Sequence, residues 1–255
     1  MTSASPASLV LARKLLAELL GTLLLVAIVV GSGIMAQQLS PADTGLQLLQ
    51  NSIATALGLA VLIAVLGPAS GAHFNPVVSL VDALLGRRDR SGLSPVELGG
   101  YVAAQTLGGI AGAVLANLMF QVPTAIATTE RVDAGRLLAE TIATASLVLV
   151  IVALSRTGKA AAIAPAVGAY IGAAYWFTSS TSFANPAVTI GRVFSDTFAG
   201  IAPASVLPFI AAQLVGGLLG AALAAFLHPV QMPTPVPVPT TTTDAARPAA
   251  SAISN

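Results

Sequence analysis

Hydrophobic residues along the chain fall into six long apolar runs that are separated by short polar breaks. A helix needs roughly 20 apolar residues to cross the ~30 Å hydrocarbon core of a bilayer. We therefore predict an all-α membrane protein with six transmembrane helices at 13–35, 46–67, 96–120, 136–155, 160–179 and 204–228. The mean hydropathy of +0.87 and the charged share of 8% exclude an ordinary soluble domain.

The basic residues outside the apolar runs indicate how the chain is inserted. On the side that holds both termini of a six-span chain lie Arg13, Lys14, Arg87, Arg88, Arg90, Arg156 and Lys159. The opposite side carries Arg131, Arg136 and Arg192. Short cytoplasmic loops carry an excess of Lys and Arg, so we expect both termini in the cytoplasm.

The two ends of the chain depart from the apolar pattern. Residues 1–12 form an N-terminal cytoplasmic segment, and the absence of a small-residue cleavage site indicates that the first apolar run is retained as a helix. Residues 229–255 are rich in Pro and Thr. This composition does not support a packed core, so we expect a disordered cytoplasmic tail.

Three stretches of the first half recur in the same order in the second half. "RKLLAELLGTLLLVAIVV" resembles "RLLAETIATASLVLVIVA", "GAHFNPVVSL" resembles "TSFANPAVTI", and "YVAAQTLGGIAGAVLANLMF" resembles "FIAAQLVGGLLGAALAAFLH". Chance similarity of apolar helices explains one such match but not three in order. The chain therefore divides into repeats at 13–120 and 136–228. Three spans per repeat place the second repeat upside down relative to the first.

An Asn-Pro pair opens a short apolar segment in each repeat, at 76–86 and at 186–196. Eleven helical residues rise about 16 Å, which is half of a bilayer. Asn suits the N-cap position, and Pro suits the first helical turn, where its missing N–H costs nothing. We therefore expect two half-helices that enter from opposite faces and meet near the midplane, where Asn75 and Asn185 come together.

Two Asn-Pro signatures on an inverted six-span repeat, "SGAHFNPVVS" and "ANPAVT", resemble the aquaporin and aquaglyceroporin (major intrinsic protein) family. The resemblance implies the aquaporin fold, homotetramers in a lipid bilayer with one pore per subunit, and passive flow of water or small uncharged solutes. The pore-signature residues that it implies are Asn75, Pro76, Val77, Asn185, Pro186 and Ala187.

The same resemblance assigns three further residues around the pore. Glu18 and Glu140, in the "LLAE" starts of the two repeats, match glutamates that brace the pore loops. An ordinary interfacial charge is the alternative for both glutamates. His73 matches a pore-side histidine, and a loop histidine that only holds backbone is an equal alternative for it.

The expected selectivity filter departs from the family pattern. Val188 stands where an arginine usually follows the second signature, and the first signature reads Asn-Pro-Val. Counting from the signatures without gaps places Thr55 and Ser182 at two more filter positions. The fourth position lies within 173–176 of the fifth span, where we take Ala173. Thr, Ser and Val make this filter wider and less charged than that of water-selective members.

A bacterial branch of the family that is associated with arsenic handling resembles this chain in the valine after Asn-Pro-Ala and in the run "YWFTSSTSFANPAV". This resemblance implies a multi-pass channel in the bacterial inner (plasma) membrane. The solutes that it implies are glycerol-like polyols and metalloid hydroxides such as arsenite or methylated arsenicals, with water as a further candidate.

The chemistry-bearing residues exclude several other functions. The chain has no cysteine, which excludes disulfides, thiolate metal sites and cysteine nucleophiles. His73 and His228 stand apart from each other and from any nucleophile arrangement, so we expect no metal, no cofactor and no enzyme activity. A net charge of +1 offers no basic surface to nucleic acid.

Three other membrane functions remain open at this point. An ion-coupled secondary transporter also uses inverted repeats, but it usually carries an intramembrane acid near the helix break, whereas Asp82 and Asp196 lie at half-helix ends. A water-selective aquaporin would need a narrower filter. A structural membrane protein of the lens-junction kind would conduct weakly.

Overall fold

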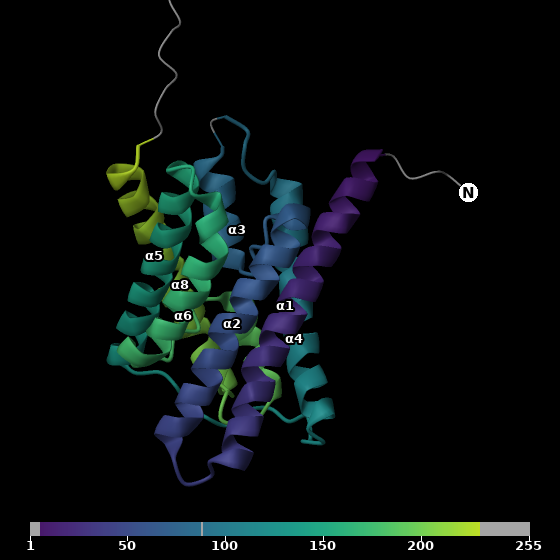
Figure 1. Cartoon of the computed structure of the whole chain (residues 1–255), viewed down its shortest axis with the longest axis vertical. Helices are drawn as coiled ribbons and strands as arrows, with labels where there is room; N and C mark the ends of the chain where they lie inside the picture. Colours follow the sequence, from purple (N-terminus) through teal and green to yellow (C-terminus); the bar gives the residue numbers. More distant parts are fainter. Residues whose placement is uncertain (1–5, 88, 230–255) are drawn as a thin grey trace, which may run out of the picture.

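Six long helices cross the bundle in the computed structural model, which describes residues 6–87 and 89–229 (Figure 1). They are α1 (Pro6–Leu39), α2 (Thr44–Ser70), α4 (Pro95–Met119), α5 (Ala134–Arg156), α6 (Ile163–Phe177), which follows the 3₁₀ turn η1 (Ala160–Ala162), and α8 (Pro203–Leu227). Within the described residues, six helical segments are long and apolar enough to cross a membrane. The prediction of six spans is therefore confirmed.

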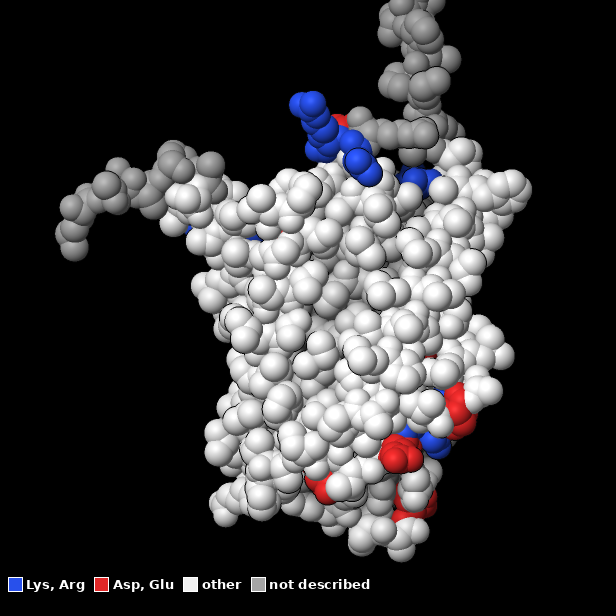
Figure 2. All heavy atoms as spheres, turned by 180° about the vertical axis from the view of Figure 1, so that it is seen from behind, with Lys and Arg blue, Asp and Glu red and all other residues white. Residues whose placement is uncertain are grey.

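The start of α1 and the end of α8 lie at the same end of the bundle, at the top of Figure 1. We call this end the proximal end and the opposite one the distal end. Lys and Arg side chains gather at the proximal end of the face in Figure 2, and most of its Asp and Glu side chains lie toward the distal end. The uncharged belt between them is the surface that a bilayer would cover.

Two short helices supply the half-helices expected from the Asn-Pro pairs. They are α3 (Pro76–Leu85) and α7 (Pro186–Gly191). Asn75 and Asn185 are their N-cap residues, and a proline opens each helix. The predicted fold class, six transmembrane helices and two half-helices in two inverted repeats, is confirmed.

The second half-helix is shorter than the predicted 186–196. The α-helix ends at Gly191 and tightens into the 3₁₀ turn η2 (Arg192–Phe194). The carbonyl of Val193 accepts a hydrogen bond from Ala127 N at 2.8 Å, and the carbonyl of Phe194 accepts one from Asn117 Nδ2 at 2.9 Å. Because these two carbonyls accept hydrogen bonds from other parts of the chain, they are not used to continue the α-helix.

The ends of the first and last spans also differ from the predicted ranges. Helix α1 begins at Pro6, so about half of the predicted N-terminal segment 1–12 is helical. Proline is tolerated in a first helical turn, and nothing between it and Arg13 breaks a helix. The predicted disordered tail falls almost wholly on residues 230–255, which lie outside the described residues.

Glycines allow the long helices of each repeat to approach closely. A Cβ at Gly108 of α4 would collide with the Leu19 carbonyl of α1. In the second repeat a Cβ at Gly216 of α8 would collide in the same way with the Thr141 carbonyl of α5. Small residues at helix crossings are the usual solution in membranes, where close packing replaces the hydrophobic effect. The two halves of the chain, which are similar in sequence, therefore also use the same kind of glycine contact between their helices.

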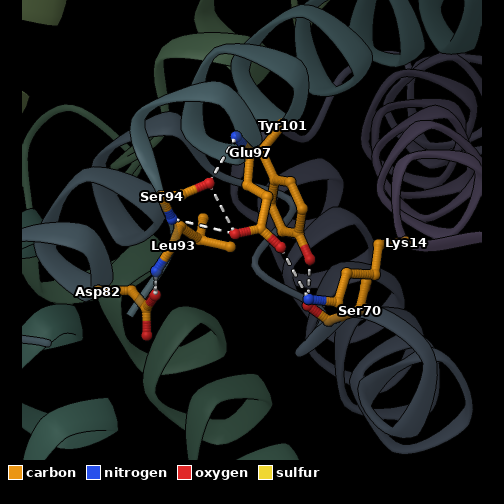
Figure 3. A network of polar contacts seen from close by, with 7 residues as sticks. All are labelled: Lys14, Ser70, Asp82, Leu93, Ser94, Glu97 and Tyr101. Carbon is orange, nitrogen blue, oxygen red and sulfur yellow. Dashed lines mark hydrogen bonds and ion pairs between the residues drawn. The ribbon is translucent and has the colours of Figure 1, made fainter. Parts of the chain in front are cut away.

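Polar contacts join α1, α2 and α4 at the proximal end (Figure 3). Lys14 Nζ of α1 lies 3.0 Å from Glu97 Oε1 of α4. Glu97 and Ser94 cap each other's backbone N–H groups at the start of α4. The hydroxyl of Tyr101 donates to the carbonyl of Ser70 at 2.6 Å. These bonds hold the helices around the first pore loop.

Candidate functional site

The two signature asparagines link the repeats at the centre of the bundle. Asn75 Nδ2 donates to the carbonyl of Ala184 at 2.7 Å, and Asn185 Nδ2 donates to the carbonyl of Phe74 at 2.7 Å. The Oδ1 atoms face the other way, since Asn75 accepts from Val77 N at 2.9 Å and Asn185 makes the matching cap. Each amide nitrogen has two hydrogens, so one remains for a solute.

Glu18 holds the loop that precedes α3. Its carboxylate accepts hydrogen bonds from His73 N at 3.0 Å and Phe74 N at 2.7 Å. Ser70 Oγ, at 2.6 Å, and Gln105 Nε2, at 2.7 Å, donate to the same carboxylate. Glu18 is fully buried, and these four donors satisfy its charge.

Glu140 makes the equivalent contacts in the second repeat. It accepts from Phe183 N at 2.9 Å, Ala184 N at 2.9 Å and Gln213 Nε2 at 2.7 Å. Phe74 and Ala184, with φ of 49° and 46°, are non-glycine residues in the left-handed region, which costs about 1–3 kcal/mol each. Each is bound through its N–H to a glutamate and through its carbonyl to the asparagine of the opposite repeat. The strained loops are therefore fixed from both sides.

A cavity of about 460 Å³ runs along these loops. Asn75 and Asn185 both line it. It reaches Arg156 at the proximal end of α5 and Arg192 beyond the distal end of α7. His73 also lines it, and its Nδ1 lies 3.1 Å from Ser79 Oγ, so the side chain is both at the cavity and bound to α3.

The residues that line the cavity toward its distal end include Thr55, Tyr175, Ser182 and Val188. The Thr55 and Tyr175 hydroxyls lie 3.2 Å apart, which joins α2 to α6. Ser182 Oγ is buried and has no hydrogen-bond partner among the described residues. This part of the cavity presents hydroxyl groups together with the apolar side chain of Val188.

The comparison with protein families settles what kind of chain this is. The family model described as Major intrinsic protein matches residues 5–179. The chain belongs to the major intrinsic protein family. It is 49% identical over 218 residues to the aquaglyceroporin AqpS of Rhizobium meliloti (strain 1021), a match that covers 85% of this chain and 91% of the relative.

More distant members match in sequence or in fold. Aquaporin-2 of Canis lupus familiaris is 40% identical over 108 residues, which cover 42% of this chain and 90% of that relative. The X-ray structure of the aquaglyceroporin from Plasmodium falciparum superposes with a TM-score of 0.63, covering 86% of this chain and 96% of the other at 20% identity. The fold is therefore that of this family over nearly all described residues.

Membership of the major intrinsic protein family makes the chain an aquaglyceroporin-type membrane channel and not an enzyme. It does not favour the alternative of an ion-coupled secondary transporter. Among the described residues there is also no group of three or more His, Cys, Asp or Glu side chains that could hold a metal ion.

The expected filter residue on the fifth span needs a correction. Ala173 is exposed on the outside of α6 and does not line the cavity, whereas Tyr175 is buried and does. Two residues on a helix point about 200° apart, so only one of the pair can face inward. The apolar side chains all round this helix gave no periodic signal to choose between its faces.

Val77, Pro76, Pro186 and Ala187 lie behind the cavity rather than on its wall. Val77 is buried against α5 and α8 in a cluster with Val81, Val148, Val152, Ala221 and Ala224. The departure from Asn-Pro-Ala in the first signature therefore affects the packing of α3 against α5 and α8, and Val77 itself is not part of the cavity lining.

Sequence reasoning missed two groups around the cavity. Gln105 and Gln213 each link a loop-bracing glutamate to a half-helix, through Ser79 Oγ and Thr189 Oγ1 respectively, both at 2.9 Å. The recurring "AAQ" in the two halves was the signal for these glutamines. Arg192 was counted only among the basic residues on the side opposite the termini, although it is buried and lines the cavity.

Proposed function

We propose that the chain is a passive channel for small uncharged solutes that are larger than water. The solutes are glycerol-like polyols and neutral metalloid hydroxides such as arsenite or methylated arsenicals, with water as a further permeant. One observation carries the proposal: Thr55, Tyr175, Ser182 and Val188 line the distal cavity, and no arginine stands at position 188.

The chemistry of this lining suits a solute with hydroxyl groups. Thr55, Tyr175 and Ser182 offer hydroxyls that both donate and accept hydrogen bonds. The unpartnered Ser182 Oγ is free to replace a water molecule of the solute's hydration shell. Val188 offers an apolar surface to the carbon or metalloid face of the solute. Replacement of a five-donor guanidinium by an isopropyl group also widens the passage.

The asparagines supply a second binding point deeper in the cavity. Each has one amide hydrogen left after its bond to the opposite loop. The N-termini of α3 and α7 also meet here, and each carries a partial positive charge of about +0.5. Oxygen atoms of passing solutes accept hydrogen bonds at this point, while cations and a continuous proton wire are disfavoured.

Arsenite would pass as its neutral hydroxide. The chain has no cysteine, so trivalent arsenic cannot be held on thiolates along the way. The neutral hydroxide presents three O–H groups, like a polyol, to the same set of hydroxyls and amides. Val188 is also the position at which the chain resembles the arsenic-associated branch.

The setting that we propose is the bacterial inner (plasma) membrane, with both termini in the cytoplasm and four copies in a homotetramer. The basic residues at the proximal end support the orientation. Large apolar side chains on the outside of the bundle, including Leu57, Val65, Leu207 and Phe226, support contact with lipid or with neighbouring copies.

A permeability panel in proteoliposomes tests the proposal. Stopped-flow swelling is recorded with water, glycerol, urea, arsenite and methylarsenite, with sucrose as an impermeant solute and empty vesicles as background. We expect protein-dependent flux of glycerol and arsenite that does not change with an imposed proton or sodium gradient. Flux of water alone would replace the proposal with the water-selective alternative, and a gradient-driven flux would replace it with a transporter.

A further inference from the structure

A buried arginine, Arg192, and a half-buried one, Arg131, lie at the distal mouth of the cavity. Arg192 follows Val188 by one helical turn and lines the main cavity. It also lines a second cavity of about 150 Å³, together with Arg131 from the connection between α4 and α5. Both cavities thus share the Arg192 side chain. A solute that passes between them meets two guanidinium groups.

The protein holds both guanidinium groups at the wall. Arg131 donates from Nε to the Gly200 carbonyl at 2.7 Å and from Nη2 to the Phe198 carbonyl at 3.0 Å. Arg192 Nε donates to the Ala199 carbonyl. Their Cζ atoms lie 5.3 and 3.5 Å from the centroid of the Phe183 ring, within cation–π range.

Neither guanidinium forms an ion pair with an acidic side chain among the described residues, and the buried Glu140 is the one carboxylate that acts on both from a distance. The ion pairs formed within the described residues are Lys14–Glu97 and Arg136–Asp133, and neither includes Arg131 or Arg192. Burial lowers the pKa of Arg131 to about 10, so this side chain is still protonated at neutral pH. The partners of both guanidiniums are backbone carbonyls and one ring, which leave the net positive charge at the mouth.

The position in the first repeat that is equivalent to Arg192 carries a negative charge and lies toward the proximal end. Arg192 lies seven residues after Asn185, and seven residues after Asn75 stands Asp82, which lines the same cavity. Asp82 Oδ2 accepts from Leu93 N at 2.9 Å (Figure 3). The two half-helices therefore carry opposite charges at equivalent positions, Asp82 toward the proximal end and Arg192 toward the distal end.

We propose that Arg192, with Arg131 beside it, is the charge barrier that keeps cations out of the distal mouth. The inference rests on the proposed function, a channel for uncharged solutes without an arginine at position 188. A fixed charge near a low-dielectric wall repels a cation over several ångströms and leaves a neutral solute unaffected. Because the guanidinium of Arg192 lies against Phe183, the charge is present without the constriction that an arginine in the ring would add.

The test compares cation leak with glycerol flux in the same proteoliposomes. The variants are Arg192→Gln, Arg192→Lys and Arg131→Gln. Arg136→Gln serves as the matched control, because Arg136 is a partly exposed distal arginine that forms an ion pair with Asp133. We expect Arg192→Gln to raise the ratio of potassium to glycerol permeability by at least about tenfold. Arg131→Gln should raise the ratio less, and Arg192→Lys and Arg136→Gln should keep the wild-type ratio.

A wild-type ratio in folded Arg192→Gln protein would overturn the proposal. If this variant is not recovered as folded protein, Arg131→Gln decides, and an unchanged ratio there also overturns it. The glycerol arm of the wild-type protein separates this result from the proposed function. Absence of wild-type glycerol flux contradicts the proposed function, whereas a potassium leak that appears on removal of Arg192 supports the barrier by itself.

Discussion

Val77 of α3 occupies the space that a side chain at Gly217 of α8 would need. A Cβ built at Gly217 lies 2.2 Å from Val77 Cγ1. We therefore expect Gly217→Ala to destabilise the protein by about 1–3 kcal/mol, the usual cost of overpacking. The double variant Val77→Ala/Gly217→Ala should recover most of this loss.

Thermal unfolding in detergent measures both variants. Gly99→Ala is the control, because a Cβ at Gly99 of α4 meets no atom within 4 Å. This control should match the wild type or exceed its stability slightly. A double variant as unstable as Gly217→Ala alone would show that the Val77 contact is not the cause.

The caps of the half-helices can be separated from the bonds between the repeats. Asn185→Leu removes the Oδ1 cap, at a cost of roughly 1 kcal/mol, together with the bond to the Phe74 carbonyl. Asn185→Asp keeps a cap oxygen and loses the amide donor. We expect little folded protein or no glycerol flux from Asn185→Leu, and a better yield from Asn185→Asp.

The same two substitutions at Asn75 should have the same effects. The measurements are the yield of folded protein by size-exclusion chromatography and the swelling of vesicles. Normal yield and flux in both leucine variants would rule out a meeting of these asparagines at the pore centre.

The two bracing glutamates should differ in what their loss costs. Glu18 accepts four hydrogen bonds and Glu140 accepts three. A hydrogen bond to a charged group contributes about 1.5–3 kcal/mol, and glutamine retains one acceptor oxygen. We expect Glu18→Gln and Glu140→Gln to lower the thermal midpoint, with the larger decrease at Glu18. Glu130→Gln, in an exposed loop, is the control. Equal midpoints for the wild type and both variants would contradict a bracing role.

We expect the side chain at position 188 to set the width of the passage. Val188→Arg introduces a guanidinium into the ring with Thr55, Tyr175 and Ser182. We expect this variant to fold, because loop carbonyls can accept its hydrogen bonds, and to keep water flux while it loses glycerol and arsenite flux. Val188→Leu, which adds bulk without charge, should reduce these fluxes less. Unchanged fluxes of all three solutes in folded Val188→Arg protein would show that this side chain does not line the filter.

Sequence reasoning succeeded where one local pattern has one structural solution. Twenty apolar residues can cross a bilayer only as a helix, and Asn-Pro before a short apolar segment suits a capped half-helix. Two such signatures in inverted repeats then place Asn75 and Asn185 together. Length, capping preference and symmetry were enough for this part of the fold.

The remaining features depend on partners that are distant in the sequence. Helix α6 is apolar on all sides, so the inward position of Tyr175 follows from its contact with Thr55, 120 residues away. The early end of α7 follows from Ala127 and Asn117, which bind the next carbonyls. Arg192 is held by the carbonyl of Ala199, seven residues further along an irregular segment, and by the ring of Phe183. No local pattern contains such information.

The exchange of hydrogen bonds between Asn75 and Asn185 has a consequence for biosynthesis. Until α7 has been made and inserted, the amide of Asn75 and the carbonyl of Phe74 lack their hydrogen-bond partners in the second repeat. The first repeat is therefore an incomplete folding unit, although it contains three complete spans. The centre of the pore is complete only when both repeats are in place. If the chain is divided between the two repeats and expressed as two fragments, we expect a conducting pore only when both fragments are made in the same cell.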